Sequence, residues 1–256
     1  MRCGERSSGS APTVMSRVAI VAAMEREVRP LVKKWRVSET EHDGRRFRLF
    51  SKDETVLVCG GIGAEAARRA AEAVIALFQP AVVWSAGFAG ALDPALRVGD
   101  VLQPRRIINC GDGSSVIQNA GDGVLVSFAS IATPAQKAKL RDSFAAQAVD
   151  MEAAAVARAA EARGIAFAAV KVISDEADFA FPEMEQFVDS KDRFSESKFA
   201  LYAILRPWLW PRVLRLARNS SRAAHALCNR LNLMIVNAAV QDSLSHDASA
   251  EVVERK

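Results

Sequence analysis

Short apolar runs that alternate with Ala-rich helical segments constrain the fold of this chain more than any other feature. Three of these runs, VAIVAA, AVVWS and FAAVKVI, occupy residues 18–23, 81–85 and 167–173. Short and nearly continuously apolar runs of this kind are typical of strands buried on both faces. Strong helical segments lie between them, at residues 64–78 and 152–163. This alternation predicts an α/β fold with an open, largely parallel sheet covered on both faces.

Local signals place shorter elements around these strands. The segments HDG and SKDE predict the turns of hairpin strands at residues 47–50 and 55–59. Thr133 followed by Pro134 is typical of a helix N-terminus, here for a helix that extends to Arg141. The small-residue stretch AGFAGAL, which follows the strand AVVWS, predicts a loop.

The elements fit a single domain over residues 16–240. The last part of this domain, residues 198–240, is helical in composition. The polar termini, residues 1–15 and 241–256, are expected to be a disordered tail and a frayed tail.

The composition is that of an ordinary globular protein, with half of the 256 residues apolar and a quarter charged. Four cysteines are scattered without a C-x-x-C spacing, and three histidines show no metal-ligand spacing. A disulfide framework and a metal centre are therefore not expected, and a reducing cytoplasm fits best. No run approaches the ~18 apolar residues of a membrane span. The net charge of +4 is weak evidence for an anionic partner.

Acidic residues follow the predicted strands at three points. Glu27 comes soon after the first strand, and Glu152 and Asp175 follow the strands at 148–151 and 167–173. Because ligands bind at the carboxyl ends of strands in open α/β sheets, different loops can bring these acids around one cleft. Each acid alone also fits a structural role at a helix N-terminus or a turn. That alternative does not explain why acids recur at three strand exits.

A glycine-rich turn, Gly60-Gly61-Ile62-Gly63, opens the predicted helix at 64–78. Such a helix N-terminus offers backbone N–H groups and a positive dipole end to an anion or a hydroxyl, so Gly61 and Gly63 are candidate substrate-binding residues. The pattern is not G-x-G-x-x-G, and no acidic residue follows at the spacing of a dinucleotide site. A tight strand–helix turn without a ligand is an equally weighted alternative.

Taken together, five motifs in order resemble the purine and uridine phosphorylase superfamily, and within it the methylthioadenosine/S-adenosylhomocysteine nucleosidases. The motifs are AIVAAMEREV, VCGGIGAEAA, AGFAGALDPALRVGDV, AVDMEAAAVA and VKVISDEAD, and they extend over residues 18–178. The resemblance implies a three-layer α/β/α sandwich with a central mixed sheet. It also implies a homo-oligomeric enzyme that cleaves the N-glycosidic bond of an adenine nucleoside, without a metal or an organic cofactor.

The resemblance assigns a role to each acid. Glu27 matches the carboxylate that activates the attacking water. Glu152 matches the acid that binds the ribose hydroxyls, and Met151 matches a residue packed against the sugar. Asp175 matches the acid that protonates nitrogen 7 of the leaving purine, with Ser174 orienting it. This division suits the chemistry, because the leaving base gains negative charge while a base must serve the incoming nucleophile.

Other features resemble the hopanoid-associated phosphorylases, a branch thought to cleave adenine from a lipid-linked nucleoside. The segments ATPAQKAKLR (132–141), VDME, VISDEAD and WPRVLRLAR (210–218) carry this resemblance. Phe88 stands where many nucleosidases have a serine, which makes the expected pocket more apolar. Phe128 is the first candidate for stacking on the base, and Phe179 is the next.

The sequence leaves hydrolysis and phosphorolysis open. A phosphorylase would take phosphate as a co-substrate and would want arginines, for which the strand residues Arg45, Arg46 and Arg48 are candidates. An exposed basic strand is the favoured interpretation of these arginines. A catalytically silent nucleoside-binding module is a third hypothesis, which the three intact acids argue against.

The C-terminal section is basic, with seven Lys or Arg and no Asp or Glu over residues 198–230. The favoured interpretation is a terminal helix packed on the sheet with a solvated basic face. The alternative is a peripheral contact of residues 208–230 with the inner membrane face, because Trp208 and Trp210 precede a basic amphipathic stretch. Nucleic-acid binding is not expected, since no recognised motif accompanies the charge.

Overall fold

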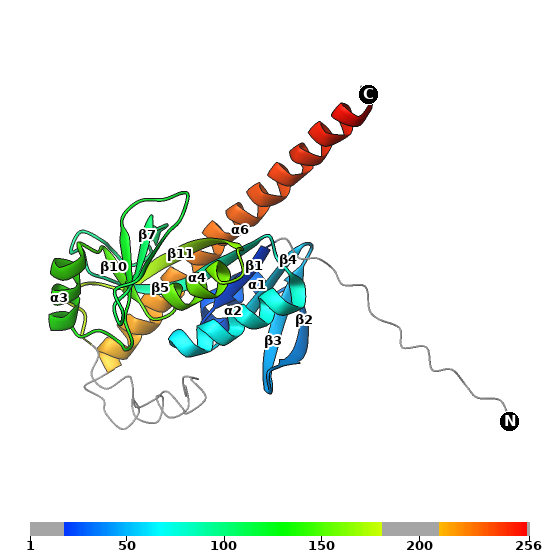
Figure 1. Cartoon of the computed structure of the whole chain (residues 1–256). Helices are drawn as coiled ribbons and strands as arrows, with labels where there is room; N and C mark the ends of the chain where they lie inside the picture. Colours follow the sequence, from blue (N-terminus) through cyan, green and yellow to red (C-terminus); the bar gives the residue numbers. More distant parts are fainter. Residues whose placement is uncertain (1–17, 181–209, 255–256) are drawn as a thin grey trace.

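The centre of the structure, a computed structural model that describes residues 18–180 and 210–254, is a set of parallel strands (Figure 1). These strands are β1 (Val18–Ala22), β4 (Thr55–Cys59), β5 (Val82–Ala91) and β11 (Ala166–Asp175). β5 pairs with β1 through its first residues and with β11 along its whole length. The register places Lys171 beside Gly87 and Asp175 beside Gly90, with an irregularity between Ile173 and Asp175. Two polar residues of β11 thus lie next to glycines of β5.

The outer strands make the sheet mixed, as predicted. Antiparallel strands β2 (Arg36–His42) and β3 (Arg45–Lys52) extend it beyond β4. On the other side β10 (Ala148–Asp150) pairs antiparallel with the end of β5, and β9, β7 and β8 follow it. The remaining bounds are β6 (Val101–Leu102), β7 (Arg106–Asn109), β8 (Ser115–Ile117) and β9 (Val124–Ser127).

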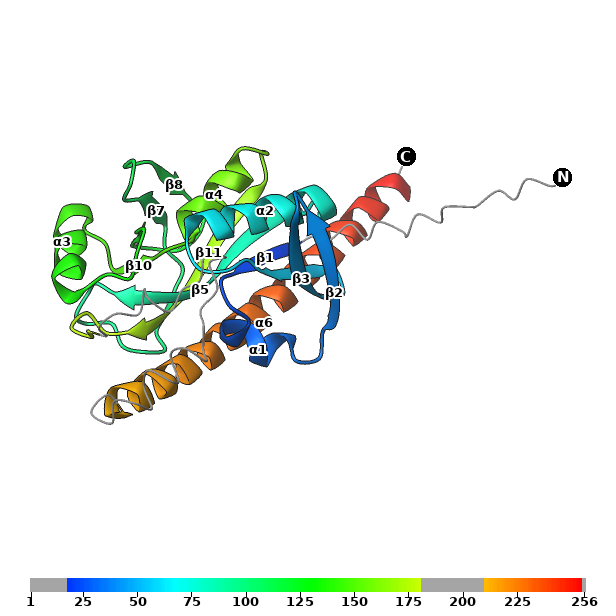
Figure 2. The same ribbon diagram turned by 90° about the horizontal axis from the view of Figure 1, so that it is seen from below.

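Helices cover both faces of the sheet, which gives the predicted three layers (Figure 2). α2 (Ala64–Phe78) and α4 (Ala153–Glu161) pack on one face, and α1 (Glu25–Val32) and α6 (Trp210–Glu254) pack on the other. α3 (Pro134–Phe144) lies at the end of the molecule beside β9 and β10. Its N-terminus has the predicted capping residue, because the Thr133 side chain accepts a hydrogen bond from the amide of Gln136.

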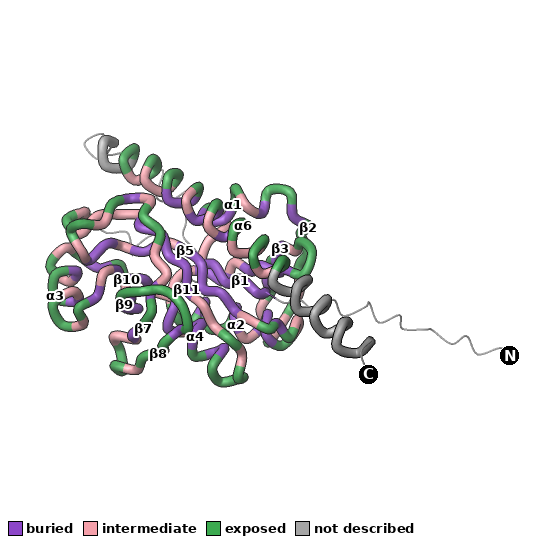
Figure 3. Tube along the Cα trace, turned by 90° about the horizontal axis from the view of Figure 1, so that it is seen from above, coloured by how far each residue is buried: buried purple, intermediate pink, exposed green. Residues whose placement is uncertain are grey.

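Buried apolar residues, many of them Ala and Val, fill the two interfaces between helices and sheet, and Figure 3 shows the central strands as buried. Ala66, Ala67, Ala70 and Val74 of α2 are fully buried, and so are Ala223, Leu227 and Leu231 of α6. Alanine lets helices approach a sheet closely, and each buried Leu or Val contributes about 1.5–3 kcal/mol through removal from water. The buried residues of α6 agree with the interpretation of the C-terminal section as a packed helix.

Three details differ from the sequence prediction. The stretch AGFAGA is the second half of the ten-residue strand β5 and not a loop, because β11 pairs with it throughout. β2 was not predicted, since its residues are mostly polar and exposed. α6 continues as one helix through Glu254, past residue 240, where the sequence suggests that the domain ends.

Several predictions fall on residues outside the described part of the chain. These are the tail at 1–15 and residues 198–209 of the C-terminal section, which include Trp208. Within residues 18–180 and 210–254, no helix is long and apolar enough to cross a membrane.

Candidate active site

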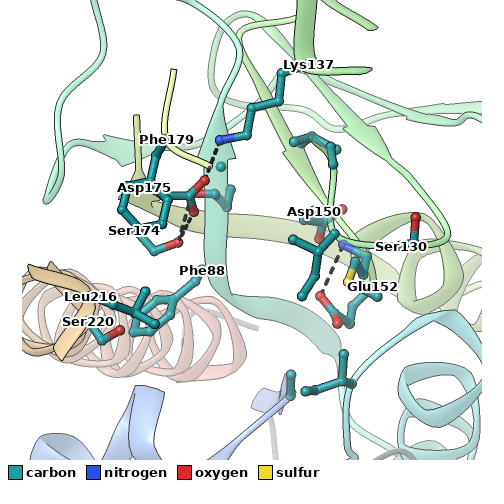
Figure 4. Close-up of a pocket in the computed structure, with 18 of the residues that line it drawn as sticks. Phe88, Ser130, Lys137, Asp150, Glu152, Ser174, Asp175, Phe179, Leu216 and Ser220 are labelled. Carbon is teal, nitrogen blue, oxygen red and sulfur yellow. Dashed lines mark hydrogen bonds and ion pairs between the residues drawn. The ribbon is translucent and has the colours of Figure 1, made fainter. Parts of the chain in front are cut away.

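A cavity of about 450 Å³ lies at the carboxyl ends of the central strands, where the sequence predicts a cleft. Its lining comes from the loop after β1, the start of α1, β5, β10, the start of α3, the end of β11 and one face of α6. The three predicted acids, Glu27, Glu152 and Asp175, all line it. Figure 4 shows Asp150 and Glu152 on one side of this cavity and Asp175 with Lys137 on another.

Glu27 is a buried carboxyl group in the first turn of α1, with 3 % of its surface exposed. Burial, together with the nearby Glu152, raises its pKa to about 8 against the opposing effects of Lys171 and Arg26. Its Oε2 atom has no hydrogen-bond partner among the described residues. A buried carboxylate oxygen without a partner is costly, so this atom is available for a proton or a ligand such as water.

A buried lysine, Lys171, lies beside Asp150 and Glu152, the two acids that flank Met151. Lys171 of β11 forms an ion pair of 2.8 Å with Asp150, and both side chains are almost completely buried. Burial opposes the charge on Lys171, but Asp150 and Glu152 outweigh it and hold the lysine pKa above its usual value. Asp150 also accepts hydrogen bonds from the Ser127 hydroxyl at 2.6 Å and from the Ala153 amide at 2.8 Å. Asp150 therefore fixes the start of α4.

Glu152 stands at the junction of two helices. Its carboxylate accepts from the backbone amide of Gly63 at 2.9 Å, at the N-terminus of α2, and from the amide of Met151 at 3.3 Å. Burial and the neighbouring Asp150 raise its pKa, while Lys171 and these two amides lower it. The anion held by the glycine-rich turn is thus Glu152 of the protein itself.

Asp175 has both carboxylate oxygens engaged. The Ser174 hydroxyl donates to Oδ1 at 2.7 Å, and the ammonium of Lys137 contacts Oδ2. The Lys137 side chain is 3 % exposed, whereas that of Asp175 is 24 % exposed and faces the cavity. The Ser174 hydroxyl is thus placed to orient the Asp175 carboxylate.

Two glycines of β5 make room for these groups. A Cβ atom on Gly87 would lie 3.0 Å from Glu27 Oε2 and 3.7 Å from Lys171 Nζ. A Cβ atom on Gly90 would lie 3.0 Å from Asp175 Oδ2 and 3.2 Å from Lys137 Cε. The glycines in AGFAG thus allow the buried side chains to approach the strand closely.

The structure brings most, but not all, of the predicted residues together. Met151, Ser174 and Phe88 line the cavity with the three acids. Gly61, Gly63 and Phe128 are not part of the lining. The Gly61 amide bonds to Ala23, the Gly63 amide bonds to Glu152, and Phe128 packs in a separate apolar cluster. Of the two stacking candidates, the lining contains the second, Phe179.

Four residues of the site were missed by the sequence analysis. Lys171 lies inside an apolar strand, and Lys137 lies among other basic residues of a helix. Leu216 and Ser220 of α6 also line the cavity, beside Phe88 (Figure 4). An apolar strand that contains one lysine was the signal for Lys171, because an unpaired buried ammonium would be too costly to retain.

Among residues 18–180 and 210–254, no group of three or more His, Cys, Asp or Glu side chains is arranged to hold a metal ion. Asp150 and Asp175 are instead paired with lysines, Glu152 accepts from backbone amides, and Oε2 of Glu27 is left without a partner among the described residues. The site thus contains the elements of acid–base chemistry.

Comparison with known proteins identifies the family of this chain. The family model of the phosphorylase superfamily matches residues 17–134 and 123–206, which together make up most of the chain. The chain therefore belongs to the phosphorylase superfamily.

The similar proteins within that superfamily include nucleosidases. A 5'-methylthioadenosine/S-adenosylhomocysteine nucleosidase of Bacillus cereus is 27 % identical over 215 residues, which cover 68 % of this chain and 92 % of the relative. The nucleosidase of Helicobacter pylori, solved with a bound pyrrolidine compound, has a TM-score of 0.66 at 17 % identity and covers 87 % of this chain and 99 % of its own. A futalosine hydrolase of the same organism has a TM-score of 0.61 at 19 % identity, covering 85 % of this chain and 98 % of its own. These solved structures show that the fold is shared.

Proposed function

We propose that this protein is a nucleosidase that hydrolyses the N-glycosidic bond of an adenine nucleoside, of the methylthioadenosine/S-adenosylhomocysteine type. The observation that carries the proposal is the unpartnered Oε2 atom of the buried Glu27 in the same cavity as Asp175. One group is suited to take a proton and the other is placed to deliver one. The names of the relatives support the same reaction.

Glu27 acts as the base. Its pKa of about 8 makes its carboxylate a stronger proton acceptor than an ordinary glutamate. A water molecule bound to Oε2 would lose its proton to Glu27 as its oxygen forms a bond to the ribosyl C1' atom. General-base assistance of this kind contributes roughly 10²–10⁴-fold to the rate.

Asp175 acts on the leaving group. As the bond between C1' and N9 breaks, the electron pair of the bond moves into the purine, and a proton delivered through Asp175 to N7 neutralises it. Glu152 and Met151 line the same cavity, where they bind the ribose in this assignment. All steps use side chains of the protein, so the reaction requires no metal or organic cofactor.

We take water as the nucleophile, because the arginines considered for phosphate lie outside the cavity lining. Of the three arginines considered for phosphate, Arg48 pairs with Glu25 at 2.7 Å and Arg45 donates to the Gly60 carbonyl at 2.8 Å. Neither these two nor Arg46 lines the cavity. The homo-oligomeric assembly expected from the resemblance stays a prediction.

A second candidate is a phosphorylase that releases adenine from a hopanoid-linked adenosine at the membrane surface. The observation that favours it is the apolar wall made by Phe88 and Leu216, with Phe179 also in the lining. Such a wall suits a large apolar substituent on the ribose as well as a methylthio group. The proposed membrane contact through residues 208–230 belongs to this alternative only.

One assay separates the candidates. The protein is incubated with methylthioadenosine, S-adenosylhomocysteine or a hopane-linked adenosine, with and without phosphate, and free adenine is measured. Release from the two small nucleosides without phosphate supports the nucleosidase. Release only from the lipid-linked substrate, or only with phosphate, supports the alternative and contradicts the main proposal. No release from any substrate supports a silent binding module.

A further inference from the structure

Lys137 is a buried lysine that the mechanism above does not use. Its ammonium contacts Asp175 Oδ2 and donates to the backbone carbonyl of Glu176 at 2.8 Å. The side chain lines the cavity and points at Asp175 (Figure 4). Burial of an ammonium is costly, even with two acceptors, so its retention at this place calls for a reason.

The local structure fixes this contact in several ways. Thr133 caps α3, and the Lys137 amide donates to the Thr133 carbonyl in the first turn of the helix. Gly90 leaves the space that the lysine stem and the Asp175 carboxylate occupy together. The Lys137 ammonium is therefore held on Asp175 by the fold itself.

The contacts of Asp175 leave its proton unaccounted for. An ammonium on one oxygen and a hydroxyl donor on the other stabilise the ionised carboxylate. Yet a leaving purine needs a proton, and Asp175 in its ionised form has none to give. The other cations near the cavity lie in different places. Arg26, which also lines the cavity, is on α1 next to Glu27. Arg215 pairs with Glu176 at 3.2 Å.

We propose that Lys137 is a positioning residue for Asp175 and supplies the proton that Asp175 passes to the leaving purine. This inference rests on the proposed nucleosidase function. As the bond from C1' to N9 breaks and its electron pair enters the purine, a proton moves from Lys137 Nζ to Asp175 Oδ2. Asp175 then passes this proton on to N7 of the purine.

The proton balance closes through solvent. The attacking water gives one proton to Glu27, and Lys137 gives one to the purine through Asp175. When the products leave, Glu27 releases its proton and the neutral amine of Lys137 takes one up. The net reaction consumes one water molecule and yields the free purine and the sugar.

The test compares two leaving groups in Lys137→Met. Methylthioadenosine has a purine that needs a proton, whereas the nitrophenolate of 4-nitrophenyl riboside leaves without one. We expect kcat for methylthioadenosine to fall about 10²-fold with KM within about threefold. The kcat for the nitrophenyl riboside is expected to stay within about threefold. An equal loss on both substrates, which a merely structural role would give, overturns the proposal, and so does no loss on either.

Lys137→Arg separates proton supply from charge. Arginine keeps the positive charge on Asp175 but is not deprotonated in proteins. It should therefore be as slow as Lys137→Met on methylthioadenosine and normal on the nitrophenyl riboside. Full activity of Lys137→Arg on methylthioadenosine would show that charge alone suffices, and would overturn the proposed proton supply.

Chemical rescue provides a second readout if the methionine variant does not fold. In Lys137→Ala, added propylamine is expected to restore adenine release at least tenfold, because its ammonium carries N–H protons. Propyltrimethylammonium has the same charge and no such proton, so it should not rescue. Equal rescue by both compounds contradicts the proposal. Failure of the unaltered protein to release adenine contradicts the nucleosidase function itself, whereas unaffected variants contradict only the role of Lys137.

Discussion

Glu27 and Asp175 line the same cavity but lie in contrasting surroundings. Glu27 is almost completely buried, has a free oxygen and has its pKa raised to about 8. Asp175 is partly exposed to the cavity, and both of its oxygens are engaged. Each region also holds a buried lysine, but Lys171 pairs with Asp150 and Lys137 contacts Asp175 itself.

The contrast indicates how one cavity can hold a base and an acid at the same pH. Lys171 neutralises Asp150, so burial and the nearby Glu152 raise the pKa of Glu27, which makes its ionised carboxylate a strong proton acceptor. Lys137 meets its carboxylate directly, so that pair is balanced in charge. The position of a lysine relative to the reacting carboxyl group therefore distinguishes the two regions.

The largest expected effect in this comparison is that of Glu27→Gln. The variant keeps the shape of the side chain but has no base for the attacking water. We expect kcat to fall roughly 10³–10⁴-fold for methylthioadenosine and also for 4-nitrophenyl riboside, since both reactions need the water. A loss confined to methylthioadenosine in these kinetic assays would assign Glu27 to the leaving group and contradict its role as the base.

Variants of the two β5 glycines, Gly87 and Gly90, test the surroundings of Glu27 and of Asp175 separately. Gly87→Ala would press on Glu27, and Gly90→Ala would press on Asp175 and Lys137, each with a Cβ only 3.0 Å from a carboxylate oxygen. We expect Gly87→Ala to slow both substrates about tenfold to a hundredfold. Gly90→Ala should slow methylthioadenosine by a similar factor and leave the nitrophenyl riboside nearly unchanged.

The thermal midpoints of the two glycine variants serve as the control, since overpacking also destabilises a protein. If both variants affect both substrates alike, the cavity does not divide into two regions as described.

A smaller effect is expected on stability. In the unfolded chain Glu27 has a pKa near 4.5, against about 8 in the folded protein. Between these values the folded state holds a proton that the unfolded state has released, so the contribution of Glu27 to stability falls as pH rises through this window. Glu27→Gln carries no such proton. The free energy of unfolding of the variant, relative to that of the unaltered protein, should therefore rise between about pH 5 and pH 8. The expected rise is on the order of 2 kcal/mol.

Denaturant unfolding of both proteins across this pH range measures the difference. A constant difference from acid to neutral pH would show that Glu27 does not hold a proton in the folded state.

The sequence predicted the frame of the fold because periodicity and capping are local properties. The strand at 18–22, the helix at 64–78 and the Thr133 cap were all found in this way. The loop predicted for AGFAGA was wrong, since its small residues looked like a turn. What makes this segment a strand is its pairing with β11, which lies about 80 residues away along the chain.

The candidate site could be predicted only where an acid followed a strand within a recognisable motif. Glu27, Glu152 and Asp175 met that condition. Lys137 did not, because it resembles a surface residue of a basic helix, and its partner Asp175 lies 38 positions later. The sequence also did not show what the amide of Gly63 binds. The carboxylate that accepts its hydrogen bond belongs to Glu152, which lies 89 positions later in the chain.

The central claim, that Asp175 serves the leaving purine while Glu27 serves the water, is tested most directly by Asp175→Asn with two substrates. The measurement is the ratio of kcat for methylthioadenosine to kcat for 4-nitrophenyl riboside, in the variant and in the unaltered protein. The account predicts that this ratio falls roughly 10²–10⁴-fold, because only the purine needs a proton. An unchanged ratio would contradict it.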